Sequence, residues 1–575
     1  MASLPLSSTV AISNISSLFR PHQPRLSPPP RRLTISCNGT NSAESQHGKV
    51  DRRNLLLGMG GLYGATNIIL PGDALASPIP APDLAKCTRG TNLNLRQPLD
   101  VDCCPPFSEN AVDYKLPAAT EIRVRPAAHL ADKDFIAKYE KATELMKALP
   151  ADDPRNFMQQ ANVHCAYCNL TYDQGGADPS NKLQIHFSWL FFPWHRWYLY
   201  FYERILAKLI DDPTFALPYW NWDNPKGMAM PSMFVKENSS LFNPRRNQAH
   251  LPLVNLPPLA DLRFSKKSST APDKIVPSNL TEMYSEMVRS AVNLEDFYGA
   301  KYDLGAKPDP GAGTVERGSH TAIHAWVGDP NSPAGEDMGN FYSTGRDPLF
   351  FCHHANVDRM WSVWRDLRGS KPKEFSDPDW LDTSFLFYDE NAQLVRVKVR
   401  DTVENLKMGY TFQKVEIPWL NKRPKARVRK SKVAAMSSAP KATDTSVFPV
   451  KLDKVVRVLV DRPKRKRSKN EKEKEEELLV IEGIEVDTSE FVRFEVFVND
   501  EDDDPSDVID LAEYAGGYSQ VPHKNAGNVK SKIRVGLTEL LEDLDVEDDD
   551  KILVSLVPRD GGEDITIGGV KIIYV

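Results

Sequence analysis

Apolar residues recur at helical spacing along much of the first two thirds of the chain. Matches to a 3.6-residue period predict helices over residues 133–149, 193–210, 280–293, 320–329 and 353–367. Pro193 opens the second stretch, and proline is favoured at the first position of a helix. Such helices pack their apolar faces around a common interior, so the sequence predicts a mainly α domain, a helix bundle with long loops.

The pattern changes after Lys371, and from Val447 to Val575 it has a period of two. Residues 378–401 indicate strands and loops that pack on the helices. Further on, alternating apolar residues predict strands over 454–462, 491–500, 551–560 and 570–575, with the charged run 464–477 as a solvated loop between them. We therefore expect an all-β, sandwich-like C-terminal domain. Its only histidine is His523, so no metal-site spacing indicates chemistry of its own.

Length and charge set the broad organisation. A chain of 575 residues is too long for one ordinary core, so at least two domains are expected. The formal net charge of −6 does not indicate nucleic-acid binding. Residues 421–432 hold seven basic residues in twelve and precede a small, polar stretch that ends at Ser446, which predicts a flexible, protease-sensitive linker. A nucleic-acid-binding arm is the alternative, and the acidic remainder of the chain disfavours it.

The N-terminal segment has the composition of a targeting sequence. Its first 50 residues contain 13 Ser/Thr, five Lys/Arg and one acid, as in an organelle transit peptide. Arg52–Arg53 precede a mostly apolar run, and Ala74-Leu75-Ala76 has the A-x-A form of a signal-peptidase site. The run is too short and glycine-rich for a transmembrane helix. A transit peptide followed by a twin-arginine signal is typical of a plant thylakoid-lumen protein. The alternative is a disordered N-terminus with a buried apolar turn. Cleavage after Ala76 removes seven basic and three acidic residues, which leaves a formal charge of −10.

Of the seven cysteines, Cys37 would leave with the targeting segment. In an oxidising compartment, the four nearest the mature N-terminus would form two disulfides in one of three pairings: Cys87, Cys103, Cys104 and Cys165. Cys168 and Cys352 then have no disulfide partner. Residues 165–168 form a C-x-x-C, whose alternatives are a redox pair or half of a zinc ribbon. The chain has no second C-x-x-C and no βαβ pattern around this one.

The histidines have spacings that suit metal binding. His320 and His324 are four residues apart, which on a helix places both rings on one face. His186 and His195 are nine apart and would lie on opposite faces of one straight helix. A helix that starts at Pro193 places His186 in the preceding segment, so the two rings can converge on one metal.

Two groups of three imidazoles follow from this spacing. The early group is His164, His186 and His195; the later one is His320, His324 and one or both of His353 and His354. Adjacent helical residues diverge by about 100°, so one metal takes only one of the tandem pair. All-imidazole ligation favours copper, zinc, iron or nickel. A catalytic zinc, with three protein ligands, accounts for one group only, whereas two facing groups suit a copper pair.

Seven long motifs occur along the chain: HCAYC (164–168), IHFSWLFFPWHRWYLYFYERIL (185–206), LPYWNWD (217–223), HTAIHAWVGD (320–329), GEDMGNFYSTGRDPLFFCHHANVDRMW (335–361), DWLDTSFLFYDE (379–390) and FPVKLDKVVRVLV (448–460). Together and in this order they resemble the plant polyphenol oxidases. These are type-3 copper enzymes, the catechol oxidase and tyrosinase group. The resemblance extends from the targeting segment to the C-terminal domain.

The resemblance implies two copper ions per chain. The first would be held by His164, His186 and His195, and the second by His320, His324 and His354. In the family pattern the second histidine of the tandem pair is the ligand, which leaves His353 as a neighbour. The resemblance also implies a Cys168–His186 thioether and the disulfides Cys87–Cys104 and Cys103–Cys165.

Four further positions are implied to act at the site. Phe341 matches the aromatic gate over the second copper, and Glu316 matches the carboxylate that holds a water near the metals. Thr321 stands where tyrosinase-type members have Asn, which implies weak or absent hydroxylation of monophenols. Ala325 is small and leaves the entrance open to bulky rings.

The implied protein is a latent polyphenol oxidase that oxidises o-diphenols (catechols) to o-quinones, with O2 as co-substrate. The expected parts are a targeting segment (1–76), a type-3 copper catalytic domain (77–420), a basic linker (421–446) and a β lid domain (447–575). Expected partners are small phenols, an activating protease at the linker and the thylakoid import machinery, with no nucleic acid and no membrane span. The expected location is the chloroplast thylakoid lumen. A specialised biosynthetic enzyme such as an aurone synthase and a haemocyanin-like oxygen carrier are the alternatives.

Overall fold

The computed structural model describes residues 77–92, 99–118, 121–175, 181–252, 257–267, 269–424, 442–500, 512–524 and 530–575. The predicted targeting segment, with Cys37, and residues 425–441 of the predicted linker lie outside these ranges. We call the described residues up to 424 the helical region and those from 442 onward the β region.

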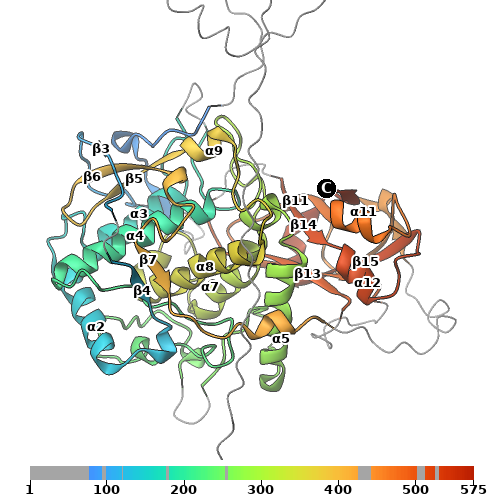
Figure 1. The fold of residues 1–575 in the computed structure, drawn as a ribbon, viewed down its shortest axis with the longest axis horizontal. Helices are drawn as coiled ribbons and strands as arrows, with labels where there is room; N and C mark the ends of the chain where they lie inside the picture. The colour runs from blue at the N-terminus through green and yellow to red at the C-terminus, as the bar shows by residue number, and fades with distance from the viewer. Residues whose placement is uncertain are drawn as a thin grey trace, which may run out of the picture. The chain divides into compact units, whose positions relative to one another are not determined.

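The helical region is built around helices that share one large core. These are α2 (Lys133–Ala148), α3 (Phe157–Cys168), α4 (Phe191–Leu209), α5 (Pro272–Tyr284), α6 (Leu294–Tyr298), α7 (Thr321–Val327), α8 (Pro348–Leu367) and α9 (Pro378–Asp382) (Figure 1). On α4, 16 of 19 residues are buried, the charged Arg196 and Glu203 among them, so the other elements enclose this helix on nearly all sides. By contrast, α2 buries four residues on one face. Thus α4 forms the centre of the region and α2 covers its outside.

Buried charges hold α4 against α8. The Arg196 guanidinium on α4 donates to Asp358 on α8 at 2.6 Å, and Arg125 bridges Asp358 and Glu203 at 2.8 Å each. All four side chains are almost fully excluded from solvent. Removing one partner would leave an uncompensated buried charge and cost roughly 3–5 kcal/mol. The network therefore fixes how the two central helices face each other.

Two π-helical turns interrupt the α-helical geometry near the candidate site. They span Ser285–Arg289, directly after α5, and Glu316–His320, directly before α7. Gly318 lies in the second turn with non-helical backbone angles, and a Cβ there would meet the Glu286 carboxylate. The Glu286 carboxylate in turn accepts hydrogen bonds from the amide and hydroxyl of Ser319, both at 2.6 Å. Turns of this kind occur often at functional sites.

Small sheets pack on the helices. Strands β5 (Ser384–Tyr388) and β6 (Leu394–Lys398) are antiparallel, and β3 (Val112–Asp113) pairs with β6. Strand β4 (Arg123–Arg125) pairs with β7 (Tyr410–Phe412), and β1 (Gly90–Asn92) pairs with β2 (Leu99–Val101). The strands predicted within residues 378–401 are therefore confirmed.

The β region contains two five-stranded arrangements around a separate aliphatic core. One sheet has the order β13-β12-β15-β10-β8; the other has β14-β11-β16-β9, with β17 also paired to β11. The strands are β8 (Thr443–Asp444), β9 (Val450–Lys451), β10 (Val456–Asp461), β11 (Glu477–Val486), β12 (Val492–Val498), β13 (Tyr514–Gln520), β14 (Ser531–Gly536), β15 (Lys551–Asp560), β16 (Ile565–Ile567) and β17 (Gly569–Tyr574). A mainly α part followed by a β sandwich is thus confirmed.

Some boundaries differ from the prediction. Helix α5 starts at Pro272, eight residues before the predicted start, because proline is favoured at the first position of a helix. A second proline, Pro277, lies inside this helix. Helix α3 was not predicted. The run 464–477 was expected to be a loop but contains helix α11 (Lys469–Lys474), whose Ser468 and Glu471 form a capping box. A second short helix, α12 (Thr538–Asp543), also interrupts the β region. Within the described ranges, no helix has the length and apolarity needed to cross a membrane.

Candidate metal centre

Four buried histidines converge where α7 meets α8. His320 ends the π-helical turn, His324 follows one turn later on α7, and His353 and His354 lie on α8. Each of the four rings has a nitrogen that lies within 4.8 Å of a nitrogen of each of the other three. The i, i+4 spacing predicted that His320 and His324 share a face, and their ring centroids are 4.7 Å apart. This later histidine group is therefore assembled from two helices.

The orientation of its rings is set by backbone carbonyls. The Nδ1–H of His320 donates to the Glu316 carbonyl at 3.0 Å, and the Nδ1–H of His324 donates to the Met338 carbonyl at 2.8 Å. Each Nε2 then has a lone pair. Nε2 of His324 lies 3.2 Å from Nε2 of His354. Two imidazole nitrogens bound to one tetrahedral metal at about 2.0 Å would be about 3.3 Å apart, so this spacing suits a shared metal.

A tryptophan distinguishes the two tandem histidines. The indole N–H of Trp222, which can only donate, lies 3.1 Å from Nδ1 of His353. That nitrogen accepts, so in the neutral ring the proton resides on Nε2 and neither nitrogen offers a lone pair. Nδ1 of His354 has no hydrogen-bond partner, and its Nε2 faces His324. The hydrogen bonding thus favours His354 over His353 as a metal ligand.

The earlier group comes from three separate segments. His164 lies on α3, His195 on α4, and His186 in the bend before α4, as expected from a helix start near Pro193. Their ring centroids are 5.0–5.7 Å apart. Nδ1–H of His164 donates to the Phe341 carbonyl at 3.1 Å, and that of His195 donates to the Phe191 carbonyl at 2.8 Å. Nε2 of both rings and Nδ1 of His186 have no protein partner.

The two groups face each other across a short distance. The rings of His195 and His354 stack with centroids 4.3 Å apart, and those of His186 and His320 are 6.2 Å apart. Burial, and next the neighbouring imidazoles, lower the pKa of these rings: to about 3 for His195, and well below the ordinary value for His186 and His354. Burial also lowers the pKa of His324, to about 4. The rings are therefore neutral near pH 7, which is the state that binds a metal.

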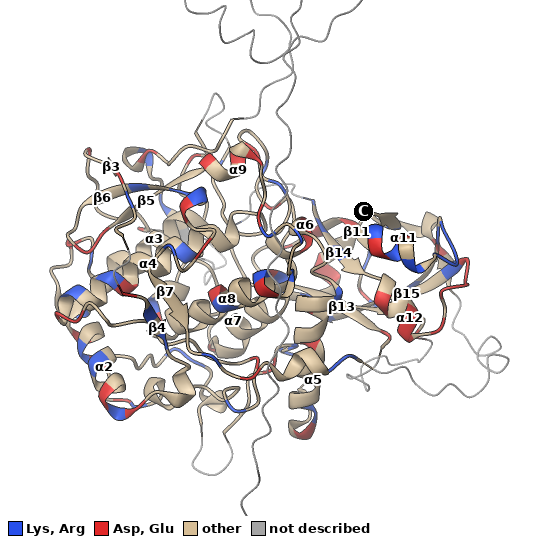
Figure 2. Ribbon diagram, viewed as in Figure 1, with Lys and Arg blue, Asp and Glu red and all other residues tan. Residues whose placement is uncertain are grey.

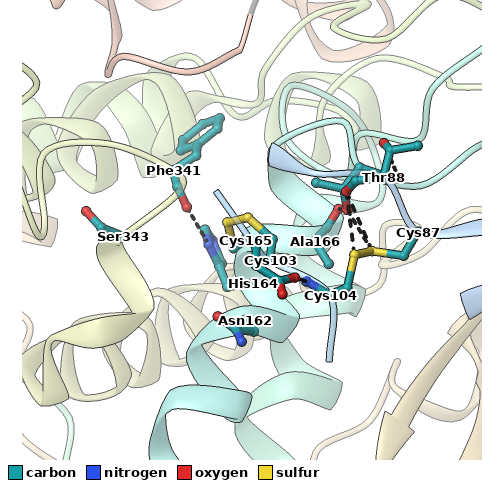
Figure 3. Close-up of a disulfide and its surroundings, with 12 residues drawn as sticks. Cys87, Thr88, Cys103, Cys104, Asn162, His164, Cys165, Ala166, Phe341 and Ser343 are labelled. Atoms are coloured by element: carbon teal, nitrogen blue, oxygen red, sulfur yellow. Dashed lines mark hydrogen bonds between the residues drawn. A yellow bond between two sulfur atoms is a disulfide. The ribbon is translucent and has the colours of Figure 1, made fainter. Parts of the chain in front are cut away.

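Sulfur chemistry surrounds the earlier group. Disulfides join Cys87 to Cys104 and Cys103 to Cys165, the pairs that the resemblance implied, and Figure 3 shows them beside His164. Cys168 is buried and unpaired, one turn after His164 on α3, and burial raises the pKa of its thiol. Its Sγ lies within 4.8 Å of ring nitrogens of His164 and His186.

Glu316 links the two groups. Its Oε1 accepts from the amide of Phe187 at 2.7 Å, and Phe187 has a positive φ of 57°, a strained conformation for this residue type. Its Oε2 is buried without a partner, and burial raises its pKa well above the ordinary value. The Thr321 hydroxyl donates to the Glu316 backbone carbonyl at 2.7 Å.

Phe341 covers the histidines on one side. Its ring stacks on that of His186 with centroids 4.1 Å apart and lies 6.3 Å from that of His164. Both histidines belong to the earlier group, whereas the resemblance placed this residue over the second metal. On its other face it stacks on His523 of the β region at 4.9 Å, and its amide donates to the Pro522 carbonyl at 3.2 Å.

Comparison with known proteins places this arrangement in a family. The model of the common central domain of tyrosinase matches residues 154–367. The models of the polyphenol oxidase middle domain and of the chloroplastic polyphenol oxidase C-terminal domain match residues 374–425 and 448–574. Polyphenol oxidase II of Ipomoea batatas is 49% identical over 99% of this chain and 96% of its own length. The chain belongs to the plant polyphenol oxidases.

Solved structures agree with this assignment. A latent apple tyrosinase is 50% identical with a TM-score of 0.76 and covers 81% of this chain and 100% of its own. A latent aurone synthase is 43% identical with a TM-score of 0.80 and covers 87% of this chain and 99% of its own. The polyphenol oxidase from Grenache (Vitis vinifera) is 52% identical with a TM-score of 0.56 and covers 60% of this chain and 99% of its own.

The names of relatives differ in activity. At 46–48% identity they include a catechol oxidase B of Solanum tuberosum, a (+)-larreatricin hydroxylase of Larrea tridentata and an aureusidin synthase of Antirrhinum majus. These cover 89–99% of this chain and 92–97% of their own lengths. Membership of the polyphenol oxidases therefore leaves the particular phenol open.

In this polyphenol oxidase the β region contacts the helical region through apolar and charged side chains. Phe491 and Val521 of the β region belong to the core of the helical region. Buried Arg263 pairs with Glu495 at 2.8 Å, and Arg289 pairs with Glu539 and Asp543 of α12, where acidic residues gather (Figure 2). The sequence indicated none of these contacts, because they join residues more than 200 positions apart. The contact of Trp222 with His353, 131 positions away, was missed because no local pattern indicates it.

Proposed function

We propose that this chain oxidises o-diphenols to o-quinones with O2 at two copper ions held by six histidines. The proposed ligands are His164, His186 and His195 for one ion and His320, His324 and His354 for the other. The observation that supports this most is the pair of facing groups. Four of the six rings donate Nδ1–H to a carbonyl. The Nε2 atoms of His164, His195 and His320 have no protein partner, and those of His324 and His354 face each other at 3.2 Å.

The donor set fits copper. Neutral imidazoles are good ligands for copper, and one group of three imidazoles alone would suit a catalytic zinc. Two groups whose rings approach to 4.3 Å suit two ions that act together. When bound, such a copper pair supplies the two-electron redox chemistry with O2. The protein supplies binding, orientation and exclusion of water.

The residues around the histidines support this role. Phe341 and Phe187 form an apolar wall against His186, where an aromatic ring can stack. Glu316 is buried and its Oε2 has no protein partner, which leaves it free to hold a water. Ala325 follows His324 and leaves space beside it.

A thioether between Cys168 and His186 is part of this proposal. The sulfur lies close to the ring, and a covalent bond would fix the ring of His186, whose Nδ1 has no carbonyl acceptor of the kind that orients its neighbours. Peptide mapping of the mature, copper-loaded protein should find the two segments cross-linked and resistant to reductant. A Cys168 that reacts with a thiol reagent in active enzyme would contradict it.

Specialised biosynthesis is the second candidate, because relatives at similar identity are named aureusidin synthase and larreatricin hydroxylase. The proposed ligands are common to both readings, so only a substrate screen separates them. An oxygen carrier is the remaining alternative, and turnover of a catechol with O2 uptake would exclude it.

We also propose that the β domain (447–575) is a lid. It covers Phe341, and cleavage in the linker (421–446) by a protease would release it from the catalytic domain (77–420). Relatives are named chloroplastic, which supports import through residues 1–76; the twin-arginine pattern supports the thylakoid lumen.

The central experiment is metal analysis of the mature protein with a screen of mono- and diphenols. We expect two copper ions per chain and rapid O2 uptake with 4-methylcatechol after linker cleavage. One copper per chain, or none with full folding, would contradict the ligand assignment. Copper without diphenol turnover would contradict the activity.

A further inference from the structure

A narrow cavity lies at Ala325, the residue that follows His324 of the later histidine group. Ala325, next to His324, lines it together with Gly328, Phe264 and Lys266 of the helical region and Phe491 of the β region. Its free volume is about 20 Å³, which is room for about one water. In the full chain it is therefore too small for a phenol.

The cavity continues into a much larger groove. The two share Asn247, Phe264, Lys266 and Pro330, and the groove has a volume of about 1060 Å³. Its inner wall is Trp326, two residues after His324, stacked on His250 with centroids 4.3 Å apart. The groove thus offers flat apolar walls that lead toward Ala325, as in a small-molecule site.

Lys266 stands at the junction of cavity and groove. Its ammonium lies 5.4 Å from the centroid of the Phe491 ring, and the carboxylates that act on it are Asp560 and Glu490. Its backbone amide also donates to Asp560 at 3.1 Å. All three partners belong to the β region. Its departure would uncover the cavity and would free the ammonium of Lys266, whose side chain is already exposed, from these carboxylates.

We infer that Lys266 binds the carboxylate of anionic o-diphenols once the β region has been displaced. This inference rests on the proposed function and names its preferred substrate class, diphenols that bear a short acidic side chain. The carboxylate takes the place of Asp560 and Glu490. The side chain passes along Trp326 and Phe264, and the diphenol ring passes Ala325 to reach the histidines.

The helical region can be tested without the β region. The two have separate apolar cores, apart from Phe491 and Val521. The solved Grenache polyphenol oxidase also corresponds to only 60% of this chain. A copper-loaded chain cleaved in its linker and freed of the β region is therefore a suitable sample.

The test compares 3,4-dihydroxycinnamate with its uncharged methyl ester on this sample. We expect Lys266→Gln to raise KM for the acid about fivefold, with kcat little changed. KM for the ester should stay within experimental error, and Lys266→Arg should restore the KM for the acid. Lys267→Gln is the matched control, because Lys267 lines the groove but not the cavity; it should leave both substrates unchanged.

A second readout does not depend on turnover. Cinnamate, which has no diphenol, should bind to the cleaved holoenzyme about fivefold more weakly after Lys266→Gln, measured by titration calorimetry, whereas cinnamide should not change. An unchanged acid-to-ester ratio in Lys266→Gln, or an equal effect of Lys267→Gln, would overturn the inference. Absence of turnover with both the acid and the ester would instead overturn the proposed function, and the cinnamate titration would then decide the role of Lys266 alone.

Discussion

The two regions of this polyphenol oxidase bury different side chains. The core of the helical region is rich in Trp, Phe and Tyr. It surrounds the seven buried histidine rings of the candidate site and the buried carboxylate of Glu316. The core of the β region consists mainly of Val, Ile and Leu, most of which come from every second position of its strands. The helical core has to present polar nitrogens in fixed directions, and large aromatic rings can enclose them with few conformers. The aliphatic core only has to pack.

The two regions also differ in the side chains that they contribute to the interface between them. The β region sends Phe491, Val521 and His523 to the helical region, and none of them is placed to bind a metal with the six proposed ligands. It contributes carboxylates that pair with Arg263 and Arg289. On the proposed function, the β region would control access to the site and the helical region would carry the chemistry.

The sharpest test of the chemical half of this comparison is the tandem pair. His354→Ala should abolish diphenol oxidation, with a loss of at least about a thousandfold, and should reduce the copper content to about one ion per chain. His353→Ala should keep two copper ions, because Trp222 already occupies the nitrogen of His353 that has a lone pair. Atomic absorption and O2 uptake on both variants give the answer.

The His353→Ala variant carries its own signature. It leaves the buried Trp222 N–H without an acceptor, which costs about 1–3 kcal/mol of stability. A lower Tm with retained copper is therefore expected. Equal loss of copper from both variants would refute the distinction.

Removing the β region tests the other half. Cleavage in the linker should raise kcat/KM for a bulky diphenol by about tenfold or more, because the closed form leaves only a small competent fraction. Copper content should not change. A full-length chain that is already as active as the cleaved one would show that the β region does not control access.

Much of the fold could be predicted, because the apolar period is strong where an element is long. Helices α2 and α8 and strands β10, β12 and β15 follow directly from that period. Helix α3 was missed because polar residues interrupt its apolar stripe: His164 belongs to the candidate site, Cys165 forms a disulfide, and Gln160 donates to the Pro154 carbonyl. The charge-rich helix α11 was missed because a run of charged residues without an apolar face indicates a loop, although Ser468 and Glu471 form a capping box.

The candidate site divides in the same way. The spacing of His320 and His324 indicated a shared face, and the helix start near Pro193 placed His186 outside α4. The choice between His353 and His354 required Trp222, 131 residues away in the sequence. The position of Phe341 against His186 also depends on tertiary packing that no local pattern encodes.

Acid should weaken the contact between the two regions. Burial alone would raise the pKa of Glu295, but Arg534 and Lys532 of the β region outweigh it and hold that pKa below its ordinary value. A carboxylate with a lowered pKa stabilises docking above its undocked pKa of about 4.3 and loses this effect as pH falls through the docked value. Asp296 acts in the opposite sense, since burial raises its pKa to about 6.

Size-exclusion chromatography of linker-cleaved protein between pH 6 and pH 3.5 measures this effect. The β region should dissociate more readily below about pH 4.3, and Glu295→Gln should dissociate about threefold more readily at pH 6 because this partly exposed ion pair is worth little. Glu295→Gln should also flatten the pH response below pH 4.3. Dissociation that is the same in the parent and the variant at every pH would remove Glu295 from the contact.

The smallest expected effect concerns Thr321 and the choice between mono- and diphenols. Hydroxylation of a monophenol needs a base to take the phenol proton, and a water held by Glu316 is the candidate. The Thr321 hydroxyl already donates to the Glu316 carbonyl at 2.7 Å, so its proton is not available to orient that water. A diphenol is more acidic and depends less on such a base.

We therefore expect strong oxidation of dopamine and weak or absent hydroxylation of tyramine by the cleaved enzyme. Thr321→Asn, whose amide offers both a donor and an acceptor, should raise the tyramine-to-dopamine ratio of kcat/KM by a few-fold, while Thr321→Val serves as the control of similar shape. Efficient hydroxylation of tyramine by the parent enzyme would overturn the expectation, and an equal ratio in the Asn and Val variants would leave Thr321 without this role.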